Sequence, residues 1–363
     1  MIEKVGVIGA GTMGAGIAQL CVQRGFAAAV FDSRPEALCK ASGRVKQGLD
    51  AAVVRGKMYG EEAQAAMRRL TFAKSLADLA GCDFIVEAAS ESLEIKRRIF
   101  EEMSRAAPKA VLATNTSSLP VAALSEFCAA PEQFLGMHFF NPPVAMKLVE
   151  IIRAPKTSDA AYRAAWDFVA QGLGRTPVAA KDTPGFIVNR VMRPYYLECQ
   201  KAALAGCPIA ALDAAAKNAG APLGPFELMD LIGLDVNLSI TKVIYQACGK
   251  PERFKPVALQ EKLVAAGALG RKAGRGFYLY KEGKAAGENP EAVELMPKGG
   301  QLAPAAQAGL SPAVAWERVI GSVIAEAGLA FEEGVASKAD IDTAIKLAMN
   351  FPRGPFEWQK ARS

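Results

Sequence analysis

The feature that most constrains this chain is the stretch KVGVIGAGTMG at residues 4 to 14, in which a short apolar run meets three glycines. The run predicts a buried strand over residues 4 to 8. The glycines at 9, 11 and 14 predict a tight turn that opens a helix ending near residue 24. The AAAVFD that follows predicts a second strand. A strand, a glycine turn, a helix and a parallel strand form the smallest dinucleotide-binding unit.

The second strand ends in a carboxylate that bears on the choice of cofactor. Asp32 stands where an acidic side chain accepts hydrogen bonds from the ribose hydroxyls of a dinucleotide. It would repel the 2'-phosphate of NADP, although Arg34 could offset part of that repulsion. We therefore expect NAD, with its pyrophosphate against the turn residues Gly9, Ala10, Gly11, Thr12, Met13 and Gly14.

Strand and helix patterns alternate through the first half of the chain and then give way to helices. Helical periodicity runs from about 35 to 80, and the strand-like runs CDFIVEAA, AVLATNTS, FLGMHFF and VEIIR follow, which predicts a parallel sheet covered on both faces. We expect four segments: an α/β Rossmann-type domain over 1–184, an all-α domain over 185–283, a linker over 284–311 and a further helical segment over 312–363.

The last helical segment repeats the helical domain before the linker. TPGFIVNRV through GPFELMD echoes SPAVAWERV through GPFEWQ, so Arg190 matches Arg318 and Glu198 matches Glu326. Both copies carry Gly-Pro-Phe-Glu at the same place, which argues against a chance similarity between alanine-rich helices. We interpret the C-terminal domain as partly duplicated.

The chain has one histidine, and its surroundings favour a chemical role over a packing role. His138 ends the predicted strand FLGMHFF, just before NPP turns the chain away, at the sheet edge where α/β proteins bind ligands. Glu150 follows a return of the chain that can bring its carboxylate beside the imidazole. Such a carboxylate fixes the tautomer of the ring and raises its basicity. A histidine packed among aromatic residues is the alternative.

Polar side chains follow another predicted strand at the same edge. TNTSSLP places Asn115, Ser117 and Ser118 there, where their side chains can hold a substrate oxygen. One of the three could instead cap the helix predicted at PVAALSEF.

Composition argues against several other classes of protein. The formal net charge is +6, but 43 basic residues are interspersed with 37 acidic ones, so no nucleic-acid-binding surface is indicated. Seven cysteines include no C-x-x-C pair, an odd count typical of a reduced protein without a structural metal. The sequence predicts neither a membrane span nor a signal peptide, so we expect a cytoplasmic protein.

The motifs occur in an order that resembles one enzyme family. GAGTMG, Asp32, NTSSL, HFFNP, KLVEII, DTPGFIVNR, GPFELMD and GRKAGRGFY follow one another as in the 3-hydroxyacyl-CoA dehydrogenases, over about residues 1 to 281. The resemblance implies an NAD-dependent enzyme that oxidises an (S)-3-hydroxyacyl-CoA to the 3-ketoacyl-CoA, or runs the reaction in reverse.

The resemblance also implies roles for particular residues. His138 is similar to the family's general base and Glu150 to its partner, while Ser117 and Asn189 would hold the substrate oxygen or orient the histidine. Family contacts to the cofactor beyond the turn and Asp32 fall on Glu91, Lys96, Ser117, Asn141 and Lys272.

The chain departs from the family pattern in two places. A hydroxyl and a lysine that usually contact CoA are replaced by Gly48 and Arg55, so either Arg55 or Lys57 pairs with a CoA phosphate, or both belong to a solvated helix face. The second helical copy has Glu317 where the first has Asn189, and we expect that copy to be structural. Family members with one copy usually dimerise through it. The second copy could replace the partner subunit and leave a monomer, with a homodimer as the alternative.

Two other functions fit part of the pattern. A short-chain 3-hydroxyacid dehydrogenase acting on free acids shares the architecture, but such enzymes usually rely on a lysine in the helical domain. The second alternative is a dehydrogenase that has lost its activity and binds NAD as a crystallin-like structural protein. The intact residues Ser117, His138, Glu150 and Asn189 argue against this alternative. The motifs leave the acyl chain length and the pathway open.

Overall fold

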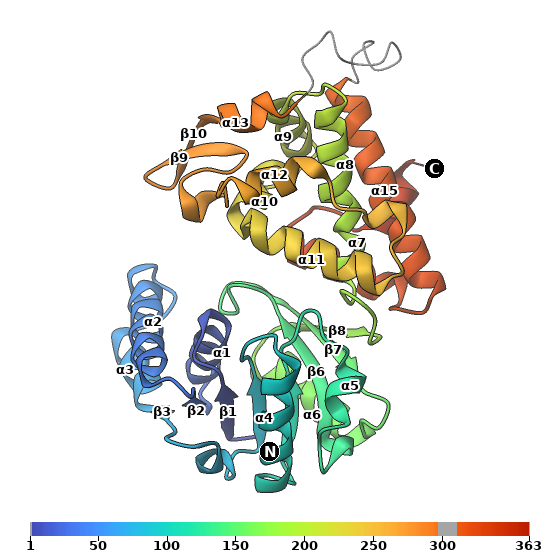
Figure 1. Ribbon diagram of the computed structural model, residues 1–363. Helices are drawn as coiled ribbons and strands as arrows, with labels where there is room; N and C mark the ends of the chain where they lie inside the picture. Colours follow the sequence, from blue (N-terminus) through green and yellow to red (C-terminus); the bar gives the residue numbers. More distant parts are fainter. Residues whose placement is uncertain (1, 297–310, 363) are drawn as a thin grey trace. The chain divides into compact units, whose positions relative to one another are not determined.

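The first of two compact units is built on an eight-stranded sheet (Figure 1). The computed structural model describes residues 2–296 and 311–362, and the chain divides into Met1–Thr183 and Pro184–Ser363. Along the sheet the order is β3-β2-β1-β4-β5-β6-β7-β8. The strands are β1 (Lys4–Ile8), β2 (Ala27–Phe31), β3 (Leu70–Phe72), β4 (Phe84–Glu87), β5 (Val111–Thr114), β6 (Phe134–Phe139), β7 (Leu148–Arg153) and β8 (Thr176–Ala180).

The sheet is parallel from β3 to β6, but β7 runs antiparallel to β6 and β8 lies parallel to β7. The predicted parallel sheet is therefore confirmed from β3 to β6, and the chain return predicted before Glu150 is the antiparallel pairing of β6 with β7. The connection from β6 to β7 covers only residues 140–147, too few for the crossover that parallel neighbours need. Every residue of β4, β5 and β6 is buried, as is typical of strands covered on both faces.

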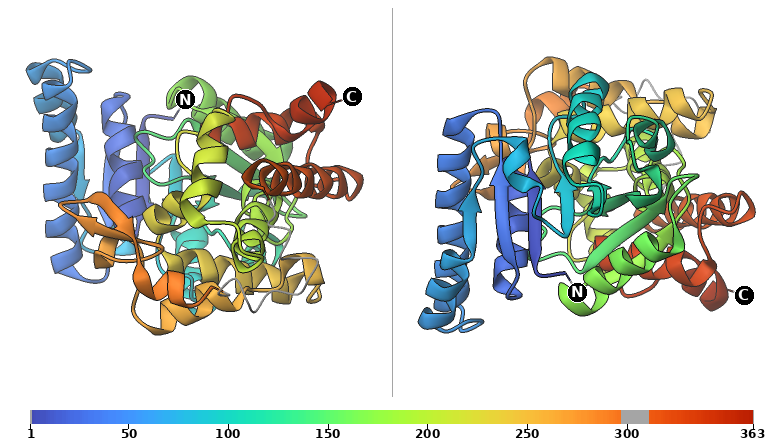
Figure 2. Two further views of the ribbon diagram at one scale, coloured as in Figure 1. Left: turned by 90° about the horizontal axis from the view of Figure 1, so that it is seen from above. Right: turned by 90° about the horizontal axis from the view of Figure 1, so that it is seen from below.

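Helices cover this sheet and fill the connections between its strands. They are α1 (Thr12–Gln23), α2 (Pro35–Val54), α3 (Gly60–Arg68), α4 (Leu93–Ala106), α5 (Val121–Ser125) and α6 (Asp159–Asp167), with short helical turns η1 (Leu76–Leu79), η2 (Pro131–Gln133) and η3 (Phe168–Gly172). The long blue helix α2 lies at the β3 edge of the sheet in both views of Figure 2. Strand β3 interrupts the helical run expected over 35 to 80, because its residues pair with β2.

The second unit consists mainly of helices. They are α7 (Val188–Val191), α8 (Arg193–Leu204), α9 (Ile209–Asn218), α10 (Pro225–Ile232), α11 (Leu234–Ala247), α12 (Ala258–Ala265), α13 (Pro290–Glu294), α15 (Pro312–Glu332), α16 (Lys338–Met349) and α17 (Pro355–Arg362), with the turns η4 (Glu252–Phe254) and η5 (Arg271–Ala273).

An antiparallel hairpin of β9 (Tyr278–Lys281) and β10 (Lys284–Glu288) interrupts these helices, so the domain is not wholly helical. A linker was expected over 284–311, but its first part contains strand β10 and helix α13. The linker prediction is therefore wrong for that part. Glu282 (φ 50°) and Gly283 (φ 75°) form the two-residue turn between the strands. The remainder of the expected linker, residues 297–310, lies outside the described residues.

The two helical copies share one capping arrangement, which explains why Gly-Pro-Phe-Glu occurs in both. In the first copy Asp213 accepts the N–H of Phe226 (2.9 Å), and Glu227 accepts the N–H of Gly224 (3.0 Å). Glycine is required at 224 because a Cβ there would overlap the Asp213 side chain. The second copy repeats all three features with Asp342, Phe356 (2.8 Å), Glu357, Gly354 (3.0 Å) and the same overlap. The two copies are therefore similar in structure as well as in sequence.

The copies pack on one another through reciprocal ion pairs. Helix α15 of the second copy lies beside α8 of the first (Figures 1 and 2). Arg190 pairs with Glu326 (2.8 Å), and the matching Arg318 pairs with Glu198 (3.2 Å). Residue i of one copy contacting residue j of the other, and the reverse, is the pattern of a two-fold dimer interface. The chain thus carries an internal pseudo-two-fold contact.

We predict that Glu326→Gln lowers the free energy of unfolding by about 2 kcal/mol, because it removes a buried charge-assisted pair and leaves Arg190 with only the more exposed Glu333 (2.7 Å) as a carboxylate partner among the described residues. Glu326 is 1% exposed and also pairs with Arg253 (2.6 Å). The matched control is Arg318→Met, which removes the symmetry-related pair at a side chain that is 64% exposed and should cost less than about 1 kcal/mol. Urea unfolding measures both values. If both variants lose the same free energy of unfolding, the buried pair contributes no more to stability than the exposed pair, and the prediction is wrong.

Candidate active site

The glycine turn after β1 is shaped for close approach of a ligand. Gly9 has φ 101°, and a Cβ there would collide with the backbone of Ala88. A Cβ on Gly14 would overlap the carbonyl of Gly9, whereas the position of a Cβ on Gly11 faces open space. Helix α1 begins at Thr12, and no side chain caps its first N–H groups. This arrangement fits a pyrophosphate at the helix N-terminus.

Asp32 is held beside this turn as an anion. Its carboxylate accepts the N–H of Ala10 (2.8 Å) and the N–H and Nε of Arg34 (3.0 and 3.4 Å). Burial raises the pKa of Asp32, but these hydrogen bonds and the Arg34 charge outweigh it, so the pKa lies below its ordinary value. Arg34 therefore pairs with the Asp32 carboxylate and stabilises its charged form.

His138 and Glu150 face each other across β6 and β7. They are direct partners in the antiparallel register, and Nδ1 of His138 lies 2.6 Å from Oε2 of Glu150. Both residues are buried, with Glu150 at 0% exposure, and the imidazole packs edge-on against Phe140. A carboxylate at Nδ1 holds the proton there, which makes Nε2 the accepting nitrogen of the neutral ring. Glu150 sits within β7 rather than at its end.

Ser117 follows β5 and is tied to Glu91. Its N–H donates to Oε1 of Glu91 (2.9 Å), and its hydroxyl lies 3.4 Å from the same oxygen. The unpredicted Thr116 donates to the other oxygen of Glu91 (2.8 Å). Asn115 contributes differently, because its Oδ1 accepts the N–H of Phe139 (2.8 Å) and so joins the ends of β5 and β6. The hydroxyl cluster and the histidine strand therefore share one sheet edge.

Neither Ser117 nor Ser118 caps α5. The first N–H groups of that helix, on Val121 and Ala122, donate to the two oxygens of Asp182 (3.0 and 2.7 Å). The capping alternative raised from the sequence is therefore wrong for both serines.

Lys96 is enclosed by carboxylates. It is 1% exposed, and its ammonium lies 2.6 and 2.7 Å from the oxygens of Glu87 and 3.7 Å from Glu91. Glu87 is fully buried and also accepts the hydroxyl of Thr114 (2.7 Å). The structure thus makes Lys96 a support for Glu91. Sequence reasoning missed Glu87, whose position at the end of β4, one strand from β1, was the available signal.

The remaining predicted residues of the first unit lie near the surface. Asn141 is exposed in the turn after β6. Arg55 and Lys57 are exposed just after α2 ends at Val54, and nothing in the structure ties either to a ligand. Gly48 packs on Gln19, whose side chain a Cβ would overlap. The departure from the family pattern at 48 therefore has a packing reason.

Two predicted residues belong to the second unit. Asn189 is half-buried in α7, and two left-handed residues, Gly185 (φ 80°) and Phe186 (φ 49°), come shortly before this helix. A non-glycine residue in that region is strained, and such strain often marks functional segments. Lys272, in η5, pairs with Asp235 at 2.6 and 2.7 Å. Burial raises the pKa of Asp235, but this ion pair and backbone hydrogen bonds leave it below the ordinary value.

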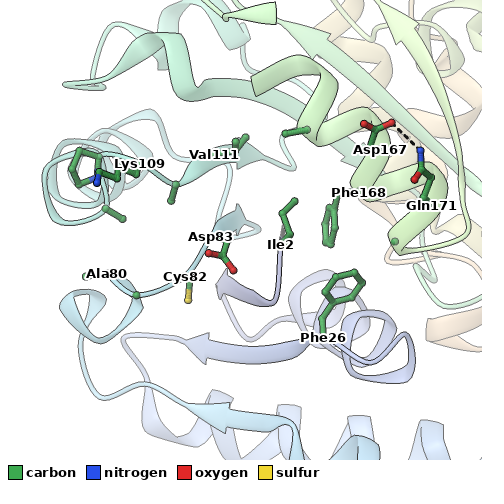
Figure 3. Close-up of a pocket in the computed structure, with 16 residues that line it drawn as sticks. Ile2, Phe26, Ala80, Cys82, Asp83, Lys109, Val111, Asp167, Phe168 and Gln171 are labelled. Carbon is green, nitrogen blue, oxygen red and sulfur yellow. Dashed lines mark hydrogen bonds between the residues drawn. The ribbon is translucent and has the colours of Figure 1, made fainter. Parts of the chain in front are cut away.

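A cavity of about 930 Å³ opens at the opposite edge of the sheet, beside the starts of β1, β4 and β5 (Figure 3). Its wall is mainly apolar, with Ile2, Phe26 and Phe168 among its residues, and Asp167 and Gln171 hydrogen-bonded to each other at the rim (3.2 Å). It contains none of the predicted site residues. In residues 2–296 and 311–362, no helix is long and apolar enough to cross a membrane, and no cluster of metal-ligating side chains occurs.

Family models agree with this organisation. The 3-hydroxyacyl-CoA dehydrogenase NAD-binding domain matches residues 4–183, and the C-terminal domain of the same family matches 185–280 and again 315–361. The second match falls on the duplicated helices.

Individual proteins of the same family are also similar to this chain in sequence and in structure. A 3-hydroxyadipyl-CoA dehydrogenase of Escherichia coli is 33% identical, over 98% of this chain and 90% of its own. A probable 3-hydroxybutyryl-CoA dehydrogenase of Deinococcus radiodurans is 40% identical over 76% of this chain and all of its own. The crystal structure of a 3-hydroxybutyryl-CoA dehydrogenase from Escherichia coli superimposes with a TM-score of 0.86 at 31% identity, covering 100% of this chain and 92% of that one. The chain, an oxidoreductase with an NAD-binding domain, belongs to the 3-hydroxyacyl-CoA dehydrogenase family.

Proposed function

We propose that the protein oxidises (S)-3-hydroxyacyl-CoA esters to 3-ketoacyl-CoA with NAD, or catalyses the reverse reduction. The observation that supports this most is the 2.6 Å contact between the only histidine and a fully buried glutamate at the ligand edge of the sheet. The relatives named for 3-hydroxybutyryl-CoA and 3-hydroxyadipyl-CoA favour CoA esters of 3-hydroxy acids as the substrate class.

His138 is the proposed general base. NAD, when bound, accepts the hydride from C3 of the substrate at its nicotinamide ring. Nε2 of His138 takes the proton from the 3-hydroxyl as the C–O bond becomes a carbonyl, so the proton goes to the imidazole while the hydride carries its electron pair to the cofactor. Glu150 holds Nδ1–H and stabilises the imidazolium that results. Ser117 and Asn189 would hold the substrate oxygen.

The first unit fits NAD. The glycine turn gives the pyrophosphate room and the uncapped N–H groups of α1, and Asp32 is an anion that can accept both ribose hydroxyls. Glu91, Lys96, Asn141 and Lys272 are further proposed contacts, with Lys96 acting through Glu91. Arg55 and Lys57 are proposed as partners of the CoA phosphates, since both are exposed cations.

The proposed function is tested by following NADH absorbance with acetoacetyl-CoA, with free acetoacetate and with no substrate. Oxidation of NADH with the CoA ester alone is expected. Comparable rates with free acetoacetate would favour the free-acid dehydrogenase instead. No turnover with either compound, from protein that binds NADH, would overturn the proposal in favour of a non-catalytic NAD-binding protein.

Removing either member of the dyad should abolish most turnover. We expect His138→Ala and Glu150→Gln to lower kcat by about 10²- to 10⁴-fold, because each removes the proton acceptor or its orienting partner. The dissociation constant for NADH, measured by fluorescence, should stay nearly unchanged, since neither side chain is a proposed cofactor contact. Retained turnover in both variants would remove the dyad from the mechanism.

Cofactor choice should depend on the charge of Asp32. We expect Asp32→Asn to raise the KM for NADH by about 10- to 100-fold, the loss typical of hydrogen bonds to a charged group, and to reduce the preference for NADH over NADPH. Kinetics with both cofactors measure this. An unchanged preference for NADH over NADPH would show that Asp32 does not bind the ribose hydroxyls.

We also infer that the second helical copy takes the place of a partner subunit, because Arg190 and Arg318 make the reciprocal contacts of a two-fold interface within one chain. Sedimentation equilibrium should then give the mass of one chain. A mass of two chains at micromolar concentration would contradict this, and would make the protein a homodimer like its single-copy relatives are expected to be.

A further inference from the structure

Arg175 is a half-buried arginine that binds backbone carbonyls instead of a carboxylate. It lies directly before β8, and its Nη2 donates to the carbonyls of Pro143 (3.4 Å) and Val144 (2.9 Å). Both acceptors belong to the β6–β7 connection, residues 140–147. Among the residues that the structure describes, no carboxylate pairs with Arg175, and its buried Nε has no hydrogen-bond partner.

The surroundings of Arg175 disfavour its charge. Burial and the neighbouring charge of Arg24 lower the pKa of Arg175 below its ordinary value. The two guanidinium groups meet at Gly174, since a Cβ there would lie 2.9 Å from Nη2 of Arg24, and Nη1 of Arg175 donates to the Gly174 carbonyl (3.3 Å). Arg175 therefore contributes little through charge pairing, and its specific contribution is the pair of bonds to the β6–β7 connection.

The β6–β7 connection is also held by a second element, helix α1. Pro143 packs so closely on Gly16 that a Cβ at this glycine would lie 2.8 Å from Cδ of the proline ring. Within the connection, the N–H of Ala145 donates to the carbonyl of Pro142 (2.9 Å) and closes a tight turn. This turn is thus fixed both by α1 and by Arg175.

The turn begins next to two groups of the proposed active site. Asn141, a proposed cofactor contact, directly precedes Pro142, and Phe140 packs edge-on against His138, with ring centroids 4.6 Å apart. His138 is held separately by Glu150, because the two residues are partners in the pairing of β6 with β7. Asn141 lies outside both strands and is exposed, so its position depends on the turn.

We propose that Arg175 is a positioning residue for the cofactor site, which holds the β6–β7 connection so that Asn141 meets NAD. This rests on the proposed function, in which Asn141 contacts the bound cofactor. The two carbonyls need a cationic donor and not the planar fork of a guanidinium, because one nitrogen makes both bonds and Nε is unused. A lysine could therefore replace Arg175, whereas an apolar side chain could not.

The test measures the dissociation constant for NADH by fluorescence, and the KM for NADH with acetoacetyl-CoA. We expect Arg175→Met to raise both by about 10-fold, the equivalent of one lost hydrogen bond to the cofactor. The kcat should stay nearly unchanged, because His138 and Glu150 keep their contact. Arg175→Lys should restore most of the affinity. Arg24→Met is the matched control, since it removes the neighbouring positive charge, leaves both carbonyl bonds in place and should not weaken NADH binding.

A second variant displaces the same turn from α1. Gly16→Ala places a methyl group against the ring of Pro143, so that one of the two must move. We expect it to raise the dissociation constant for NADH as well, although alanine favours a helix over glycine. If Arg175→Met fails to fold, this variant decides the inference, and an unchanged affinity for NADH in Gly16→Ala would then overturn it.

Three other results would overturn the inference. One is an unchanged affinity for NADH in folded Arg175→Met, or a lower kcat with unchanged KM and dissociation constant, which would make Arg175 a contributor to folding only. Another is an equal loss in Arg24→Met, because the effect would then come from charge and not from the carbonyl bonds. The third is an Arg175→Lys variant that binds NADH no better than Arg175→Met. A wild-type protein that binds NADH but turns over no CoA ester would overturn the proposed function instead, and the dissociation constants would still decide the role of Arg175.

Discussion

The contact between His138 and Glu150 depends on a reversal of chain direction at the end of a parallel sheet. Strand β7 returns antiparallel to β6 after a short connection, and this register sets the two residues directly opposite one another. A parallel neighbour would have required a much longer crossover between them. Glu150 is fully buried, so the sheet itself places a carboxyl group against the imidazole. The dyad is thus a property of strand pairing and not of loop conformation.

The other polar residues at this edge of the sheet are positioned by a buried carboxylate, Glu87, and a more exposed one, Glu91, in the loop after β4. Glu87, at the end of β4, binds Lys96 and Thr114, and Lys96 in turn lies near Glu91. Glu91 holds the loop that contains Ser117. This chain of charges ties the hydroxyl of the proposed substrate site to the core of the sheet. In the proposed function, Lys96 would therefore act on the cofactor site through Glu91.

Local patterns in the sequence predicted much of this arrangement. The glycine turn, Asp32 and the strand that carries His138 each have a short-range cause, namely glycine sterics and apolar strand periodicity. The duplication was equally visible, and it identified which residues of the two copies correspond. Gly-Pro-Phe-Glu recurs because each glycine faces an aspartate that caps the same helix.

Long-range pairing could not be predicted in this way. The partnership of Lys96 with Glu87 joins two elements, and although Glu87 stands at the end of a strand, that position does not identify Lys96 as its partner. Strand β3 is hidden in a helical pattern because only its pairing with β2 defines it. The hairpin of β9 and β10 resembles a linker in sequence because its turn is Glu-Gly rather than the more familiar Asn-Gly.

The most direct test of the dyad uses the fact that the protein has a single histidine. In the untagged protein, the imidazole signals of a long-range ¹H–¹⁵N spectrum belong to His138 alone. Addition of NAD with acetoacetyl-CoA, a pair that cannot react, should shift the Nε2 signal while Nδ1 keeps its proton toward Glu150. If both ring signals stay unchanged while other resonances show that the ligands have bound, His138 is a core residue and the proposed mechanism is wrong.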